Sequence, residues 1–271
     1  MNNGLAPIVL FVYNRPQHTQ KTLEALQKNT LASESELFVY SDAPRNAETV
    51  ERVRQVRDLL KNLQGFKSVT IVEREKNWGL ANSVIDGVTS ILQKFPNIIV
   101  LEDDLITSEN FLEYMNAALA KYNGYRNVFG ISGYSHSNDE EGFPNTYFLK
   151  LTSSWGWATW ADKWKAFCRD DLMLKKILQD PVLLAKFNYD NSFDYATMAQ
   201  FQLQRKIDSW AIYWYASVFI EDGLILYPCK SLLENIGFDG SGVHCENQLG
   251  SVKKLTVQAF NLTDEISESP E

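Results

Sequence analysis

Three consecutive carboxylates, Glu102, Asp103 and Asp104, stand directly after the apolar run at residues 98–101. A short apolar run rich in β-branched residues is typical of a strand that is buried on both faces. An unpaired buried charge costs several kcal/mol, so such a cluster is either solvated or neutralised by a cation. Ligands bind at the carboxyl ends of parallel strands. The cluster therefore indicates either a solvated acidic turn or a ligand site.

Polar side chains also follow the strands that we predict before this cluster. They are Asn14 and Arg15 after residues 8–13, Asp42 after residues 37–40, and Asn77 and Asn82 after residues 69–72. Arg15 falls in the first strand-to-helix turn, where doubly wound folds bind phosphates, although an exposed turn arginine is equally compatible with its position. Parallel strands end at the same edge of a sheet, so we expect these side chains to converge.

The elements that must hold these residues alternate regularly along the first hundred positions. Amphipathic helices are predicted at about 17–29, 50–63 and 80–92, because apolar residues recur there with a helical period. The order β-α-β-α-β-α-β favours a parallel sheet with helices on both faces. We predict an α/β fold with a mostly parallel sheet, followed by a more helical and aromatic half.

Aromatic residues concentrate in that second half. Residues 153–164 hold Trp155 and Trp157 together with two further tryptophans. Flat indole faces often hold carbohydrate, but a tryptophan-rich core is an equally good explanation. Residues 237–244 are rich in glycine and end in His244, a composition that fits a loop closing over a ligand or an ordinary surface loop.

Composition excludes several classes of protein. The chain has 271 residues and a formal net charge of -8, which argues against a nucleic-acid-binding protein. Its three cysteines are far apart and form no disulfide or metal-binding pattern. We expect neither a signal peptide nor a membrane-spanning segment, because the apolar run at residues 8–13 is short and no stretch approaches about 20 apolar residues. We expect a soluble cytoplasmic protein, with peripheral contact at an inner membrane compatible with its exposed aromatic residues.

The chain resembles the GT-A glycosyltransferases, because the predicted strand at residues 98–101 and the carboxylates Glu102 to Asp104 that follow it are similar to the Asp-x-Asp metal motif of that family. More narrowly, it resembles the N-acetylglucosaminyltransferase-I type and related bacterial enzymes. The resemblance implies that Asp104 ligates Mn2+ or Mg2+, that Asp103 lies near the ribose, and that Glu102 lies near the donor sugar. It also implies that Asn14, Arg15 and Asp42 contact the nucleotide.

The resemblance extends to the second half, over roughly residues 6 to 248. Trp155 and Trp157 match a Gly-Trp segment below the sugar, and His244 ends the loop that orders over the donor. The aspartate of an Asp-x-Trp motif implies Asp208 as the catalytic base. Without the resemblance, Asp208 is more simply the N-cap of the following helix. Asn77 and Asn82 stand where the family has a different segment, so their nucleotide contacts are an expectation only.

The resemblance divides the chain into a nucleotide-sugar-binding half at 1–106 and an acceptor-binding and catalytic half at 107–250. The acidic composition of the tail at 251–271 predicts that it is frayed. The resemblance implies a metal-dependent, inverting transfer of a hexose or N-acetylhexosamine. From the resemblance we expect a UDP-linked donor. The resemblance does not carry over to the acceptor, for which we expect a hydroxyl of a glycan or of a lipid-linked saccharide, such as a bacterial surface polysaccharide or its precursor.

Two other functions remain open at this point. A nucleotidyltransferase that makes nucleotide-sugars would share the sheet and the acidic site, but it usually has a glycine-rich loop after the first strand. Asn14-Arg15-Pro16 contains no glycine. A non-catalytic carbohydrate-binding protein would use the tryptophans and would need neither the acidic cluster nor a base.

Overall fold

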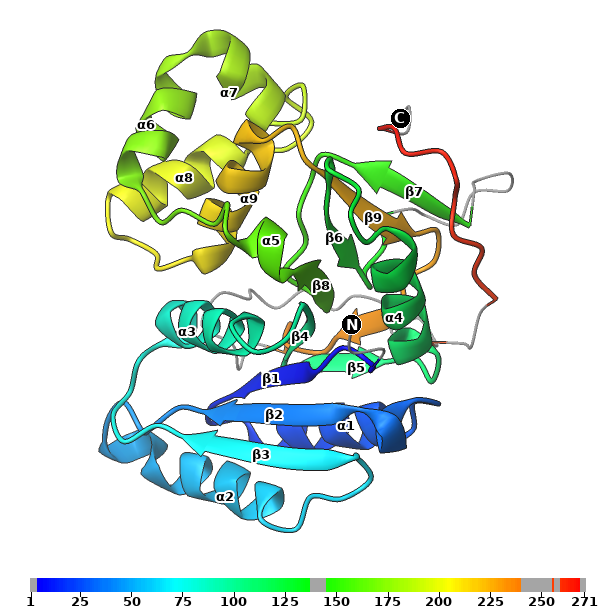
Figure 1. The fold of residues 1–271 in the computed structure, drawn as a ribbon. Helices are drawn as coiled ribbons and strands as arrows, with labels where there is room; N and C mark the ends of the chain where they lie inside the picture. The colour runs from blue at the N-terminus through cyan, green and yellow to red at the C-terminus, as the bar shows by residue number, and fades with distance from the viewer. Residues whose placement is uncertain (1–3, 137–144, 240–254, 256–258, 269–271) are drawn as a thin grey trace.

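The structure is a computed structural model that describes residues 4–136, 145–239, 255 and 259–268 (Figure 1). Its centre is an eight-stranded sheet in the order β3-β2-β1-β4-β8-β6-β9-β7. The strands of this sheet are β1 Ile8–Val12, β2 Glu36–Ser41, β3 Ser68–Glu73, β4 Asn97–Glu102, β6 Val128–Ser132, β7 Thr146–Leu149, β8 Trp157–Trp160 and β9 Leu224–Pro228. One sheet therefore runs through both halves of the chain, and the predicted α/β fold is confirmed.

The first four strands pair in parallel, as predicted. β1 lies between β2 and β4, and β2 pairs with β3. The register sets Val12 opposite Ser41 and Phe11 opposite Glu102. Because the three strands end within a residue or two of each other, the segments that follow them emerge at one edge.

The other half of the sheet is mixed. β8 is antiparallel to both of its neighbours, β4 and β6, while β6 and β9 are parallel. The strand β8 is absent from the sequence-based assignment, which treats residues 153–164 as an aromatic segment without regular structure. All four residues of β8 are buried. A short strand buried on both faces has no apolar-polar alternation to reveal it.

The helices cover both faces of the sheet. They are α1 Pro16–Gln27, α2 Val50–Leu60, α3 Leu80–Leu92, α4 Phe111–Lys121, α5 Ala161–Trp164, α6 Asp171–Gln179, α7 Pro181–Phe187, α8 Tyr195–Leu203 and α9 Trp210–Ile220, with short 3-10 turns at Ala32–Glu34 and Ala47–Thr49. One apolar core joins α1, α2 and α4 to the odd-numbered side chains of β4. The second joins α3, α5 and α9 to Ile98 and Val100.

A second sheet of two short strands brings a late part of the chain beside the acidic cluster. β5, at Leu105–Thr107, pairs antiparallel with β10, at Leu233–Asn235, so that Leu105 lies opposite Asn235. Neither strand is predicted from the sequence, because three residues are too few to show a period. The pairing brings residues 235–239 beside Asp104, about 130 positions earlier in the chain.

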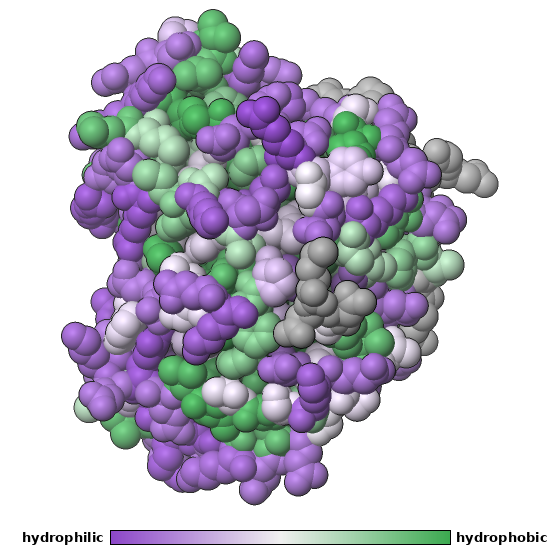
Figure 2. Space-filling view, viewed as in Figure 1, coloured by the Kyte–Doolittle hydropathy of each residue, from purple (hydrophilic) through white to green (hydrophobic). Residues whose placement is uncertain are grey.

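A third apolar core holds the helical group α6 to α9 together, at the upper left of Figure 1. Within this group, α8 covers nine residues, Tyr195–Leu203. Tyr189, Asp190 and Asn191 all have positive φ, so the chain makes a left-handed turn before α8. Figure 2 shows mostly hydrophilic residues over this group, with separate apolar residues between them.

The expectation of a frayed tail is wrong for residues 259–268. The Lys121 ammonium donates to the Leu262 carbonyl at 2.8 Å, and the Tyr122 hydroxyl donates to the Thr263 carbonyl at 2.8 Å. Phe260 packs edge-on against Tyr114. These contacts could not be predicted from the acidic composition of the tail, because they are made by a few apolar side chains and by backbone carbonyls. Within the described residues, no helix is both long and apolar enough to cross a membrane.

Candidate active site

The acidic cluster lies at the carboxyl end of β4, beside the end of β1. Asp103 and Asp104 are 4% and 7% exposed, so the solvated acidic turn that the sequence allowed is excluded. The Tyr13 amide donates to Asp103 Oδ2 at 3.3 Å. The Thr22 hydroxyl on α1 donates to the Asp103 backbone carbonyl at 2.9 Å. The cluster is therefore fixed from two neighbouring elements.

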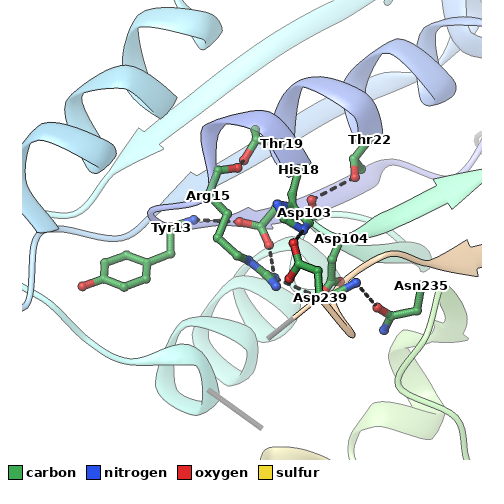
Figure 3. A network of polar contacts seen from close by, with 10 residues as sticks. Tyr13, Arg15, His18, Thr19, Thr22, Asp103, Asp104, Asn235 and Asp239 are labelled. Carbon is green, nitrogen blue, oxygen red and sulfur yellow. Dashed lines mark hydrogen bonds and ion pairs between the residues drawn. The ribbon is translucent and has the colours of Figure 1, made fainter. Parts of the chain in front are cut away.

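Arg15 neutralises this cluster. Its Nη2 donates to Asp103 Oδ1 in a short contact and to Asp104 Oδ2 at 2.9 Å. Figure 3 shows the guanidinium reaching from the start of α1 toward both carboxylates. The sequence placed Arg15 in this turn, and the structure brings it to the acids that follow β4. One cation and two anions leave a net negative charge at the site.

Burial and charge shift the pKa of each group here. Burial raises the pKa of Glu102, and the charges of Asp104 and Asp103 raise it further, to about 8. Burial also raises the pKa of Asp103, although Arg15 opposes the change. Burial lowers the pKa of Arg15, but both carboxylates outweigh that effect and keep it above its usual value. Such perturbed groups at one strand end are typical of functional sites.

Asp42 has the most fully bonded carboxylate at this edge. It accepts hydrogen bonds from the backbone amides of Ala43, Trp78 and Gly79, each with a closest distance of 2.9 Å. The Asn77 side-chain amide donates to Asp42 Oδ2 at 3.1 Å. Asp42 and Asn77 thus fix the turn that begins α3. Their predicted nucleotide contacts stay predictions.

Residues 235–239 return to the acidic cluster from the far end of the sequence. The Ile236 amide donates to the Asp104 carbonyl at 2.9 Å. A Cβ added to Gly237 would lie 2.3 Å from Asp104 Oδ2, so a larger residue there would force the carboxylate or the segment to shift. Asp239 Oδ2 lies 3.1 Å from His18 Nε2 on α1, as Figure 3 shows. The sequence analysis singles out neither His18 nor Asn235, and it places Asp239 only in the glycine-rich loop, because the proximity of these residues depends on the β5–β10 pairing.

Asp208 lies in the other half of the protein. The expectation that it caps α9 is wrong, because the Ser209 hydroxyl accepts the hydrogen bond from the Ile212 amide at 3.3 Å. Asp208 instead pairs with Arg169 at 2.5 Å, and its side chain is 53% exposed. A carboxylate freed from capping and open to solvent is compatible with the role of a base.

Asn82 on α3 links the pair of Arg169 and Asp208 to the N-terminal half of the chain. Its Nδ2 donates to the Trp78 carbonyl at 2.8 Å, and its Oδ1 accepts from Arg169 Nη1 at 2.8 Å. Asn77, Trp78, Asn82 and Arg169 line an open groove of about 640 Å³ together with neighbouring residues of α3. Arg169 is a site residue that the sequence did not reveal.

The two tryptophans differ in their surroundings. Trp155 is half-buried and lies edge-on to Tyr134 and Phe238, with ring centroids 4.6 and 5.5 Å apart. Trp157 is 3% exposed and stacks on Trp210 in the second core. Its indole N–H has no partner among the described residues. Trp157 is therefore a core residue, whereas Trp155 contacts Phe238 in the segment 235–239 beside Asp104.

Among the described residues, the structure shows no hydrogen bond between Asn14 and the acidic cluster. Asn14 lies partly exposed in the turn between β1 and α1. His244 lies outside the described residues, as does most of the glycine-rich loop. Its predicted contact with the donor stays a prediction.

The residues present fit a divalent metal that is shared with a ligand. In the described part of the chain, no group of three or more His, Cys, Asp or Glu side chains could hold a metal ion. Asp104 Oδ2 bonds to Arg15, but no donor among the described residues reaches Asp104 Oδ1. Mg2+ is commonly held by one or two carboxylates, with substrate phosphates and water completing its coordination. One buried carboxylate oxygen is enough for such a site.

Comparison with known proteins identifies the family. Residues 8–177 match the model of "Glycosyl transferase family 2". The chain therefore belongs to glycosyl transferase family 2, and the predicted GT-A glycosyltransferase resemblance is confirmed. No curated protein matches the chain.

Solved structures of glycosyltransferases are similar to this chain at low identity, and the match to GalNAc-T7 supports the fold. GalNAc-T7, in a crystal structure with UDP, GalNAc and Mn2+, is 12% identical with a TM-score of 0.52, covering 87% of this chain and 44% of that one. A mannosyltransferase from Pyrobaculum calidifontis, in complex with GDP-Man and Mn2+, is 12% identical with a TM-score of 0.43, covering 80% and 70%. This chain thus spans less than half the length of GalNAc-T7. The narrower resemblance to the N-acetylglucosaminyltransferase-I type stays a prediction.

Proposed function

We propose that the protein is a metal-dependent, inverting glycosyltransferase that uses a nucleotide-diphosphate sugar, most simply a UDP-sugar. The buried cluster of Arg15, Asp103 and Asp104 carries the proposal. Such a site in this family and fold suits a metal-bridged diphosphate. GalNAc-T7 and the mannosyltransferase were solved with Mn2+ and nucleotides, which supports a nucleotide donor and Mn2+ here.

The charges at the site favour a metal over a bare diphosphate. At about 4 Å and an effective dielectric constant of about 20, each like-charge pair costs about 4 kcal/mol. Arg15 provides one positive charge against two carboxylates. A diphosphate would add further negative charge. A divalent ion held by Asp104 would offset this repulsion and stabilise the charge that develops on the leaving diphosphate.

The chain's own residues supply the remaining steps. Arg15 lies where it can bind a phosphate oxygen while it holds Asp103. Asp208 accepts the proton of the acceptor hydroxyl, whose oxygen forms a bond to the anomeric carbon. The bond from that carbon to the diphosphate oxygen breaks, and its electron pair leaves with the nucleotide. Direct attack inverts the anomeric centre. A positioned general base typically contributes about 10²–10⁴-fold.

The acceptor is proposed by chemical class alone, as a hydroxyl of a glycan or of a lipid-linked saccharide. The groove beside Asp208, lined by Trp78, Asn77, Asn82 and Arg169, combines an aromatic side chain with amide and guanidinium groups. These are the groups that bind sugars in water. Contact with a membrane surface, a cytoplasmic location and a role in polysaccharide synthesis belong to the same proposal.

Calorimetry of UDP binding with and without Mn2+ tests the donor site. Wild type and an Asp58→Asn control, changed on the exposed face of α2, should bind UDP far more tightly with Mn2+ than without it. Asp104→Asn should lose that metal dependence. Metal-independent binding, or no binding of any nucleotide, would contradict the donor assignment and favour a non-catalytic carbohydrate-binding protein.

A second measurement tests catalysis. A screen of UDP-sugars identifies the donor that wild type hydrolyses or transfers fastest. Asp208→Asn should lower kcat for that donor by at least about 10²-fold, while Mn2+-dependent UDP binding stays unchanged. Full activity in Asp208→Asn would remove Asp208 from the mechanism but would leave the donor site intact.

A further inference from the structure

Arg169 joins the two halves of the proposed site. It lies in the connection between α5 and α6, and its two terminal nitrogens point to different partners. Nη1 donates to Asn82 Oδ1 at 2.8 Å, and Nη2 donates to Asp208 Oδ1 at 2.5 Å. A planar guanidinium fixes the directions of both hydrogen bonds. The carboxylate of Asp208 is thereby tied to the first turn of α3.

The Asn82 side chain that accepts from Arg169 is itself held by hydrogen bonds. Asn82 Nδ2 donates to the Trp78 carbonyl at 2.8 Å, which orients the amide so that Oδ1 faces Arg169. The Trp78 amide in turn donates to the buried Asp42 carboxylate at 2.9 Å. A continuous set of hydrogen bonds thus runs from Asp42, at the end of β2, through Asn82 and Arg169 to Asp208.

Asp208 needs such a partner because little else holds it. Its side chain is 53% exposed, and the helix that follows is capped by Ser209 instead. Oδ1 bonds to Arg169, and no donor among the described residues reaches Oδ2. One oxygen is therefore fixed while the other stays available to accept a proton. A base oriented by a third group in this way recurs in enzymes with activated nucleophiles.

We propose that Arg169 is a positioning residue of the transfer reaction, which holds the Asp208 carboxylate in place against the donor half through Asn82. The proposal rests on the function proposed above, in which Asp208 is the base. Arg169 also lines the groove of about 640 Å³ beside Asn77 and Trp78. A substrate in that groove would therefore lie next to the pair that Arg169 forms.

An ordinary surface ion pair is the competing explanation. Exposed pairs contribute about 0–1 kcal/mol to stability and have no necessary effect on catalysis. The pair between Arg54 and Asp58 on α2, at 2.6 Å, is of that kind and provides a matched control. Loss of either arginine should change the unfolding midpoint only slightly. Catalysis should distinguish the two pairs.

The test compares Arg169→Gln, Arg169→Lys and Arg54→Gln with the donor sugar that wild type turns over fastest. Arg169→Gln should lower kcat by about 10²-fold, the effect of a misplaced catalytic group, while the KM for the donor changes less than about threefold. Arg169→Lys should recover part of kcat, because an ammonium keeps the charge but not the paired geometry. Arg54→Gln should match wild type.

A double mutant completes the test. Because Arg169 acts through Asp208, Asp208→Asn combined with Arg169→Gln should be no slower than Asp208→Asn alone. If Asp208→Asn is inactive but Arg169→Gln keeps the wild-type kcat, the positioning role is overturned and the proposed function stands. If Asp208→Asn is fully active, the positioning role fails together with the assignment of Asp208 as the base, while the glycosyltransferase function stands. If wild type turns over no nucleotide-sugar, both proposals fail together.

Discussion

Two arginine–aspartate pairs in this protein have the same chemistry and opposite surroundings. Arg15 and its partners Asp103 and Asp104 have side chains that are 17%, 5% and 10% exposed. Arg169 and Asp208 are 35% and 53% exposed. Water screens the second pair, whereas the first has lost most of its hydration. The difference in burial predicts that the first pair sustains the fold and the second affects only the reaction.

The buried pair illustrates why such groups are expensive to disturb. Removal of one partner leaves the other charge buried and uncompensated, which typically costs more than the pair itself contributes. Asp103 also accepts from the Tyr13 amide, but that neutral donor cannot replace a full positive charge. The acidic strand end therefore depends on Arg15 before any ligand arrives.

Arg15→Ala should show the largest loss of stability. It leaves Asp103 and Asp104 without their cation, so we expect the free energy of unfolding to fall by about 3–5 kcal/mol. Urea denaturation measures this loss, with Arg54→Ala on α2 as the exposed control that should change stability by less than about 1 kcal/mol. Equal, small effects from both variants would show that burial does not separate these pairs.

Asp42 extends the comparison to a buried carboxylate with no arginine. It is 7% exposed, and N–H donors at the start of α3 stabilise its charge by hydrogen bonds. Asp42→Ala leaves those amides unpaired, and we expect a loss of about 2–3 kcal/mol, because hydrogen bonds to charged groups contribute about 1.5–3 kcal/mol. Thermal unfolding checks this value.

Asp42→Asn serves as the matched variant, since it keeps one acceptor oxygen at the same position. We expect it to be intermediate in stability. If Asp42→Ala instead unfolds like wild type but no longer binds UDP, Asp42 is chiefly a nucleotide contact and its hydrogen bonds to the turn matter little.

Much of the N-terminal half could be predicted from the sequence, because its signals are local. The first strands are long apolar runs, each followed by a helix of clear period, so topology alone brings Arg15, Asp42 and Asp104 to one edge. The sequence could not show that Arg15 pairs with both aspartates, because that depends on the length of the turn and on side-chain conformations.

The remaining site residues meet through pairings that leave little trace in the sequence. Gly237 reaches Asp104 through two strands of three residues each. Arg169 meets Asp208 because α5 and α9 pack on the same core. β8 has no alternation, and the Ser209 cap depends on where α9 begins, one residue later than an Asp208 cap would require. Long-range contacts between short elements are where sequence patterns carry the least information.

Gly237→Ala tests the contact between residues 235–239 and the buried Asp104. The added Cβ would lie 2.3 Å from Asp104 Oδ2, so the carboxylate or the segment must move. Overpacking of this kind costs about 1–3 kcal/mol, and about 1.4 kcal/mol corresponds to tenfold weaker binding. We expect about tenfold weaker Mn2+-dependent UDP binding by calorimetry. Gly4→Ala, where the new Cβ meets no atom within 4 Å, is the control.

A substitution in the helical group α6 to α9 should have the smallest effect on stability, and it tests whether kcat depends on that group as well as on Arg169. Asp180 caps α7, and its Oδ1 accepts from the Val182 amide at 2.9 Å and the Leu183 amide at 3.1 Å. Asp180→Ala should cost about 1 kcal/mol, the usual value of an N-cap. UDP affinity and kcat should stay at wild-type values, because the cap touches neither arginine pair. A fall in kcat with the fold intact would mean that the position of Asp208 depends on the whole helical group, and the positioning role would then extend beyond Arg169.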